Sequence, residues 1–202
     1  MKLARSERRA ICDLLDELGP AQPTLCEGWN TSDLAAHLVL REGRLDAMPG
    51  IAVTFLAGHT ARVQKTLASR DFRQLVETLR SGPPRFSPLR LARLDEAANG
   101  VEFVVHHEDI RRAQPSWQPR TFDRPTQDLF FKRLGFATRS SLQHKDFRVE
   151  VVRSDTGDRM TAHRPLAQAT RPAVTVTGLP SELLIFFSRQ GHAVVETDSN
   201  VF

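Results

Sequence analysis

The residues best suited to chemistry lie in one segment, NGVEFVVHHEDIRRA, residues 99–113. Glu102 and His106 are four positions apart, so on a helix their side chains lie one above the other. A carboxylate and an imidazole so placed can bind one metal ion through bonds of about 2.0–2.2 Å. Asp109 falls on the same face, where its carboxylate can hydrogen-bond a ligand imidazole. His107 points about 100° further round the helix and is not expected to join them.

A third ligand must come from another element, and His37 is the best candidate. It lies in the segment TSDLAAHLVLRE, between Ala36 and Leu38, on a face that is otherwise apolar. An imidazole buried there needs a polar partner, because burying it without one is costly. Three protein ligands would leave a coordination position for water or a substrate atom, as in catalytic zinc sites. Arg41, one turn beyond His37, is a candidate for steering an anionic substrate or cofactor towards the ion.

Spacing alone leaves other interpretations open. A carboxylate and a histidine four residues apart on a helix also form ordinary salt bridges or hydrogen bonds. His37 is equally consistent with a core histidine that has found a hydrogen-bond partner, and Arg41 with an exposed helix charge. For Cys26, a buried structural thiol is favoured over a metal ligand. Two histidines and a glutamate suit zinc, but also nickel, iron or manganese.

The first 115 or so residues are expected to form the helices that position this set. Asn30, with an acidic residue three positions later, predicts the capped start of the helix that carries His37. Asp71 predicts a second cap, with a break in the chain just before it. The expected helical regions are 3–18, 30 to about 48–50, 51–81 with a break at 69–71, and 89–113. Four helices with short connectors predict an antiparallel bundle.

The pattern changes after residue 115. A proline-rich stretch, 114–125, is typical of a linker, and a helix is expected over 126–143. The hydrophobic period then becomes two, which predicts a hairpin from FRVEVV and RMTAHR around the turn SDTGD. PAVTVTG and HAVVET are further expected strands, with a helix over 180–187 between them. The fold class is therefore mainly α with a small α/β part.

Three segments of the chain resemble a known family. PTLCEGWNTSDLAAHLVLRE and NGVEFVVHHEDIRRAQPSW together are similar to actinobacterial proteins of the mycothiol-dependent maleylpyruvate isomerase superfamily, which is related to the DinB-like helical bundles. The nearest resemblance is to its uncharacterised metal-binding branch, and GLPSELLIFFSRQ is similar to its C-terminal segment. The resemblance implies a metal-binding DinB-like four-helix bundle over 1–115. It also implies a small α/β, sterol-carrier-like domain over 126–202.

The resemblance also implies a function. It assigns a divalent metal, usually zinc, to His37, Glu102 and His106, and mycothiol as a thiol cofactor whose sulfur the metal would hold as thiolate. The expected activity is a thiol transferase or isomerase acting on a small electrophilic substrate. The chain has no tyrosine, no segment identifies maleylpyruvate, and no residue is assigned a catalytic role. The alternative is a non-catalytic, metal-stabilised module that holds an apolar small molecule.

Composition limits the partners and the compartment. The net charge of +4 comes from 28 basic residues scattered among 24 acidic ones, so no nucleic-acid partner is expected. No apolar run of about 18 residues is present, so no membrane is expected, and the charged N-terminus does not resemble a secretory signal. We therefore expect a cytoplasmic monomer or homodimer. Cys12 and Cys26 are expected to be reduced thiols, with a disulfide between them as the alternative.

Overall fold

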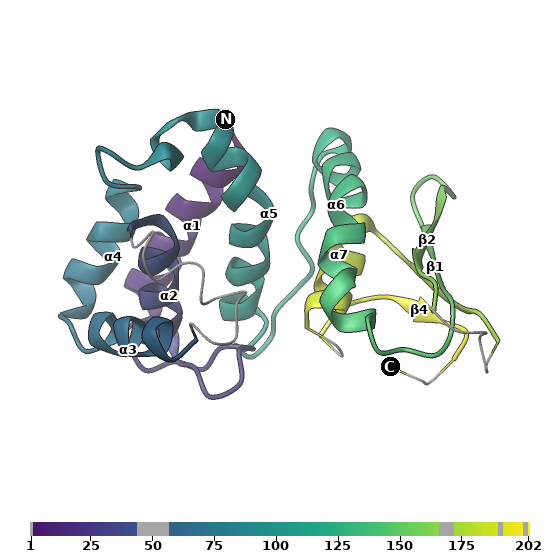
Figure 1. The fold of residues 1–202 in the computed structure, drawn as a ribbon, viewed down its shortest axis with the longest axis horizontal. Coiled ribbons are helices and arrows are strands. Elements are labelled where there is room, and N and C mark those ends of the chain that lie inside the picture. The colour runs from purple at the N-terminus through teal and green to yellow at the C-terminus, as the bar shows by residue number, and fades with distance from the viewer. Residues whose placement is uncertain (1, 44–56, 166–171, 190–191, 200–201) are drawn as a thin grey trace. The chain divides into compact units, whose positions relative to one another are not determined.

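The computed structural model describes residues 2–43, 57–165, 172–189, 192–199 and 202. The chain divides into two compact units, Met1–Trp117 and Gln118–Phe202, and each is considered by itself. It is mainly helical, with a small four-stranded sheet in the second unit (Figure 1). Among the described residues, no helix combines the length and the apolar character needed to cross a bilayer.

The first unit is built from helices. They are α1 (Leu3–Leu18), α2 (Thr31–Gly43), α3 (Ala57–Ala68), α4 (Phe72–Ser81), a 3-10 turn η3 (Pro88–Arg90) and α5 (Ala92–Arg111). α1 packs against α4 and α5, and α2 packs against α3 and α4. The two helices that carry the candidate ligands, α2 and α5, thus belong to one packed unit.

Local sequence signals explain where these helices begin. At the start of α2 the Asn30 side chain accepts a hydrogen bond from the Asp33 amide (3.0 Å), and the Asp33 carboxylate accepts one from the Asn30 amide (3.1 Å). This reciprocal cap satisfies two amides that the helix cannot. Asp71 caps α4 through the Gln74 amide at 2.9 Å. Both predicted caps are confirmed.

The predicted break at 69–71 is confirmed, because α3 ends at Ala68 and α4 begins at Phe72. One helical boundary differs from expectation. The helix expected over 89–113 begins at Ala92 instead of 89, because Pro88–Arg90 form a 3-10 turn. The predicted end of the second helix near 48–50, and the predicted start of the third at 51, lie outside the described residues.

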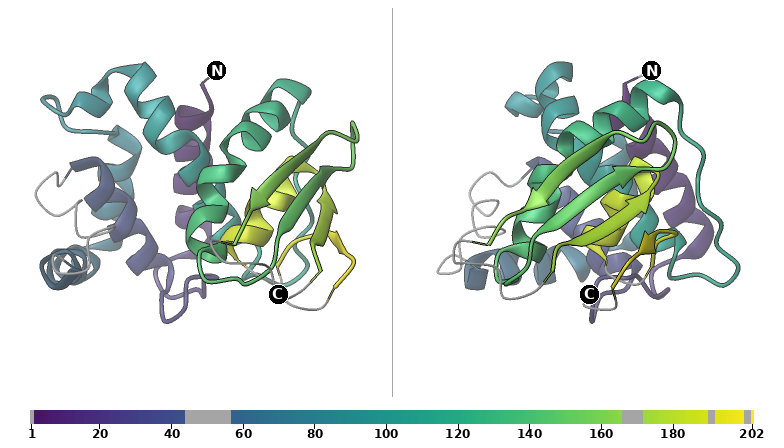
Figure 2. Two further views of the ribbon diagram at one scale, coloured as in Figure 1. Left: turned by 45° about the vertical axis from the view of Figure 1, so that its right-hand side comes forward. Right: turned by 90° about the vertical axis from the view of Figure 1, so that its right-hand side faces the viewer.

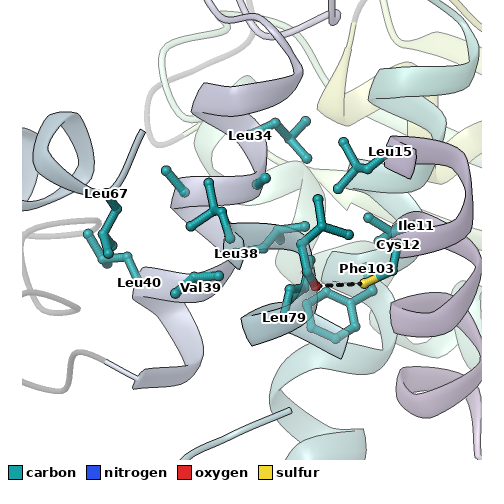
Figure 3. Close-up of a cluster of buried hydrophobic side chains, with 14 of the residues drawn as sticks. Ile11, Cys12, Leu15, Leu34, Leu38, Val39, Leu40, Leu67, Leu79 and Phe103 are labelled. Carbon is teal, nitrogen blue, oxygen red and sulfur yellow. Dashed lines mark hydrogen bonds between the residues drawn. The ribbon is translucent and has the colours of Figure 1, made fainter. Parts of the chain in front are cut away.

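The core of the first unit is apolar and lies between α1, α2, α4 and α5. Figure 3 shows Ile11, Leu15, Leu34, Leu79 and Phe103 converging there, and all are at most 1 % exposed. Cys12 also lies in this core as a free thiol, with its sulfur 3.7 Å from the carbonyl oxygen of Val76. Burial raises the pKa of Cys12 to about 12, so the side chain behaves as a small apolar group.

The second unit contains α6 (Arg124–Leu142), β1 (Val149–Arg153), β2 (Arg159–His163), β3 (Val174–Gly178), α7 (Pro180–Ser188) and β4 (Glu196–Thr197). The strand order is β2-β1-β3-β4, with β1 antiparallel to β2 and parallel to β3. α6 and α7 pack together behind the sheet (Figure 2, right). The predicted hairpin, β3 and α7 are confirmed, whereas the expected last strand is only two residues long.

Candidate metal centre

His106 is held by a carboxylate of its own helix. Its Nδ1 lies 2.9 Å from Asp109 Oδ2, one turn further along α5, and both residues are buried. This is the hydrogen bond that the spacing predicted. A carboxylate at Nδ1 favours the tautomer that carries its proton there and leaves the Nε2 lone pair for a metal ion.

Glu102 lies on the Nε2 side of the same ring. Its Oε2 is 3.8 Å from His106 Nε2. Two ligands with bonds of about 2.1 Å to one tetrahedral ion would be about 3.4 Å apart, so a small adjustment of a half-exposed side chain would close the pair around an ion. The distance is too long for a direct hydrogen bond.

Arg41 contacts Glu102 instead of extending into solvent. Its Nη1 lies 3.6 Å from Glu102 Oε2, and its Nη2 donates to the carbonyl oxygen of Ala98 at 3.2 Å. The guanidinium therefore joins α2 to α5 and compensates the charge of the carboxylate that faces His106. Arg41 is therefore a partly buried charge paired with Glu102.

His37 approaches the pair from α2. Its ring centroid is 5.1 Å from that of His106, at an interplanar angle of 66°, and the side chain is buried. The other side of the ring faces Trp29, also at 5.1 Å. The fold thus places the rings of His37 and His106 next to each other, although they are 69 positions apart in the chain, with Glu102 on the Nε2 side of His106. Among the described residues, however, His37, Glu102 and His106 are not a group whose donor atoms all lie within 4.8 Å of one another.

The connector before α2 supplies a contact that the sequence did not indicate. Cys26 Sγ lies 3.3 Å from Asp109 Oδ2, the same oxygen that His106 contacts, and the Leu25 amide donates to the Asp109 carbonyl at 3.0 Å. Cys26 is a free thiol, as expected. No helical periodicity places a loop residue against α5, so spacing could not reveal this role.

Cys26, His106 and Asp109 form an alternative donor set. Among the described residues, one potential ligand atom from each lies within 4.8 Å of the other two. The 2.9 Å between Asp109 Oδ2 and His106 Nδ1 is a hydrogen-bond distance, and two ligands so close would subtend only about 90° at a zinc ion. These distances are those of a carboxylate that orients His106 and Cys26 through hydrogen bonds.

A buried layer of charge borders the site on α5. Arg8 pairs with Asp95 at 2.8 Å and with Glu42, and Asn99 donates to Asp95 at 2.9 Å. Burial raises the pKa of Glu42 to about 7, although the Arg8 guanidinium opposes the shift. Nothing in the local sequence distinguishes Arg8, Glu42 and Asp95 from ordinary exposed charges, so their burial could not be predicted.

His107 is directed away from the candidate centre, as predicted. Its Nδ1 lies 2.9 Å from Glu7 Oε2 on α1, and both side chains are buried. The adjacent histidines of α5 therefore have different roles: His106 faces the α2 side, and His107 joins α5 to α1.

An open pocket of about 600 Å³ lies beside His37. Its walls come from the connector, α2 and α3, and it is lined by Gly28, Trp29, Asp33, His37, Thr60, Ala61, Gln64 and Lys65. A turn closed by the Trp29 amide and the Cys26 carbonyl (3.0 Å) places the indole there. Gly28 has a φ of 74° in this turn, a conformation that favours glycine.

Compared with protein-family models, curated proteins and solved structures, the chain matches none.

Proposed function

We propose that the first unit binds one divalent metal ion, zinc in the first instance, through His37, Glu102 and His106. The observation that carries the proposal is the orientation of His106: Nδ1 is held by Asp109, and Nε2 faces Glu102 at 3.8 Å. A histidine bound by a carboxylate at one nitrogen and facing a second carboxylate at the other is the arrangement common in zinc sites. His37, whose ring centroid is 5.1 Å from that of His106, is the proposed third donor.

We further propose that the bound ion is catalytic, in a thiol-dependent transferase or isomerase acting on a small electrophilic substrate. The pocket beside His37 supports this, because a structural zinc site is closed by four protein ligands whereas a catalytic site keeps an open position. A bound zinc ion would supply a deprotonated thiol at neutral pH. The resemblance to the maleylpyruvate isomerase superfamily is the basis for naming mycothiol as that thiol.

This chain's own residues would prepare such a site in three ways. Asp109 fixes the His106 tautomer, and Arg41 keeps Glu102 beside it. Trp29 and the pocket walls would orient the bound molecule next to His37. No described residue is assigned the role of general acid or base.

The finer description of the fold belongs to the same proposal. The order and packing of α1, α2, α4 and α5 are consistent with a DinB-like antiparallel bundle, with α3 as an added short helix. The sheet with two helices on one face is consistent with a small sterol-carrier-like domain. We place the protein in the cytoplasm, as a monomer or homodimer.

The test is elemental analysis of the purified protein, for the wild type and for His37→Ala, Glu102→Ala and His106→Ala. About one equivalent of zinc is expected in the wild type, with loss of the ion in each variant. His144→Ala is the matched control, because His144 is exposed on the second unit and its loss should leave the metal content unchanged. Retention of the ion in all three site variants would overturn the proposal.

A second measurement separates a catalytic ion from a structural one. Thermal unfolding is followed with and without chelator. A structural ion predicts that the first unit unfolds when the ion is removed. A catalytic ion held by three ligands at the edge of a preformed core predicts a folded apo protein that rebinds zinc.

A further inference from the structure

The pocket beside His37 has charges of both signs on facing elements. Asp33 lies on α2 one turn before His37, and Lys65 lies on α3, four positions after Ala61. Asp33 is partly buried, whereas Lys65 is exposed at the rim. Among the described residues no ion pair joins these two side chains, and both line the pocket. One carboxylate oxygen of Asp33 accepts the Asn30 amide in the helix cap.

Uncharged lining residues lie on the same sides of the pocket as Asp33 and Lys65 and suit the same ligand charges. The indole of Trp29 lines the pocket with Asp33, and an aromatic face beside a carboxylate attracts a cation through both its π electrons and the negative charge. Gln64 lines the α3 side with Lys65 and can hydrogen-bond a carboxylate together with the ammonium group. A volume of about 600 Å³ is in the range of small-molecule sites.

We propose that this pocket binds a small zwitterion, a molecule that carries both an ammonium group and a carboxylate, such as an amino acid or a short peptide. The ammonium group lies against Asp33 and Trp29, and the carboxylate lies against Lys65. That the zwitterion is presented to a metal ion at His37 rests on the proposed function. The recognition of its two charges rests on the pocket alone.

The test uses probes that differ only in charge. ε-Aminocaproate carries both groups on a flexible chain and has no adjacent amine and carboxylate with which to chelate a metal. Hexylamine and hexanoate have the same carbon chain and one charge each. Isothermal titration of the full-length protein should give an affinity for ε-aminocaproate about two- to fivefold higher than for either control, since one solvent-exposed ion pair contributes up to about fivefold.

Two variants assign each charge to its residue. Lys65→Gln should bind ε-aminocaproate no better than the wild type binds hexylamine. Asp33→Asn should bind it no better than the wild type binds hexanoate, while the Asn side chain keeps an oxygen for the cap with Asn30. Lys132→Gln, an exposed lysine on the second unit, is the control that should change nothing. Lys65 is exposed, so its variant tests the proposal even if Asp33→Asn unfolds.

The outcomes separate this inference from the metal proposal. Each titration is run on protein of measured zinc content, before and after treatment with chelator. Zinc present without preference for ε-aminocaproate, or a preference unaffected by Lys65→Gln, overturns the inference and leaves the metal site standing. A preference that needs Lys65 in a protein that never binds zinc supports the pocket and overturns the proposed function.

Discussion

Each unit of the molecule contains an arginine paired with two carboxylates, and the two groups behave in opposite ways. In the first unit Arg8 contacts Glu42 and Asp95, with side chains 8 %, 3 % and 13 % exposed. In the second unit Arg153 is equally buried, but its partners Asp128 and Asp155 are 39 % and 23 % exposed. The cation is similar in the two groups, and only the surroundings of the anions differ.

The difference appears in the acidity of the carboxyl groups. Burial raises the pKa of Glu42 to about 7, whereas hydrogen bonds from Arg153 lower the pKa of Asp128 and of Asp155. A guanidinium partner therefore does not guarantee an acidic carboxyl, because desolvation prevails when both charges leave water. The first unit, which contains the candidate metal centre, is therefore the one in which buried charges carry a desolvation cost.

The largest expected effect is a change in the free energy of unfolding when either arginine is replaced. Arg8→Met should lower the free energy of unfolding of the first unit by about 3–5 kcal/mol, because it leaves Glu42 and Asp95 buried without their cation. Arg153→Met should cost less than about 2 kcal/mol, since water can solvate Asp128 and Asp155. Urea unfolding followed by segment-resolved hydrogen exchange measures both. Equal losses in the two units would remove the distinction drawn between them.

A second prediction concerns pH and the first unit. The folded-state pKa of Glu42, about 7, lies above its unfolded value of about 4.3. Its contribution to stability is therefore fully present below pH 4.3 and is lost as the pH rises to about 7, an effect on the order of 3 kcal/mol. Hydrogen exchange in α1, α2 and α5 at pH 5 and pH 8 would measure it. Glu42→Gln should abolish this part of the pH dependence, and an unchanged profile would contradict the assignment.

The third prediction concerns the contribution of the Asp109 carboxylate to zinc affinity. Asp109→Asn keeps the shape of the side chain but removes the charge that orients His106. If the proposed centre is correct, zinc affinity should fall by about 10–100-fold, as measured by competition with a chromophoric chelator. Asp95→Asn, in the charge layer and away from the His106 ring, is the control expected to leave zinc affinity within a few fold. Equal losses in both would indicate a general loss of structure.

The smallest expected effect is in the second unit and has the opposite sign to that of Glu42. The pKa of Asp128 is lowered by Arg153 and Arg124, so its contribution to stability is present above its unfolded value of about 3.9 and is lost as the pH falls below it. Asp128→Asn should flatten the acid limb of unfolding of this unit alone. A change in the first unit instead would show that the two regions are not separate in their response to acid.

Much of the fold could be predicted because local chemistry decides it. Asn30 with Asp33, and Asp71, determine helix starts through their own side chains. The alternation of buried and partly buried residues in β3 follows from one buried face. The turn at Pro88 was missed because 3-10 and α-helical segments share the same short-range apolar pattern. The last strand was overestimated, since only Glu196 and Thr197 pair with β3.

The candidate site could be predicted only in part, for a physical reason. Glu102, His106 and Asp109 lie on one helix, so their relation follows from the helical period. The placement of Cys26 on Asp109, and of Arg8 between Glu42 and Asp95, depends on how separate elements pack. The amino-acid sequence alone contains no signal for contacts between separate elements. The burial of His37, in contrast, could be predicted because its neighbours on the helix are apolar.

One contact has consequences for how the site would respond to its ligand. The connector that carries Trp29 into the pocket is bonded through Leu25 and Cys26 to Asp109, which holds His106. A molecule that displaces the indole would therefore also displace Asp109, which orients the ring of His106, the proposed metal ligand. Binding free energies linked in this way are reciprocal: if the occupied pocket strengthens the hold on the ion, the ion must strengthen the hold on the occupant by the same factor.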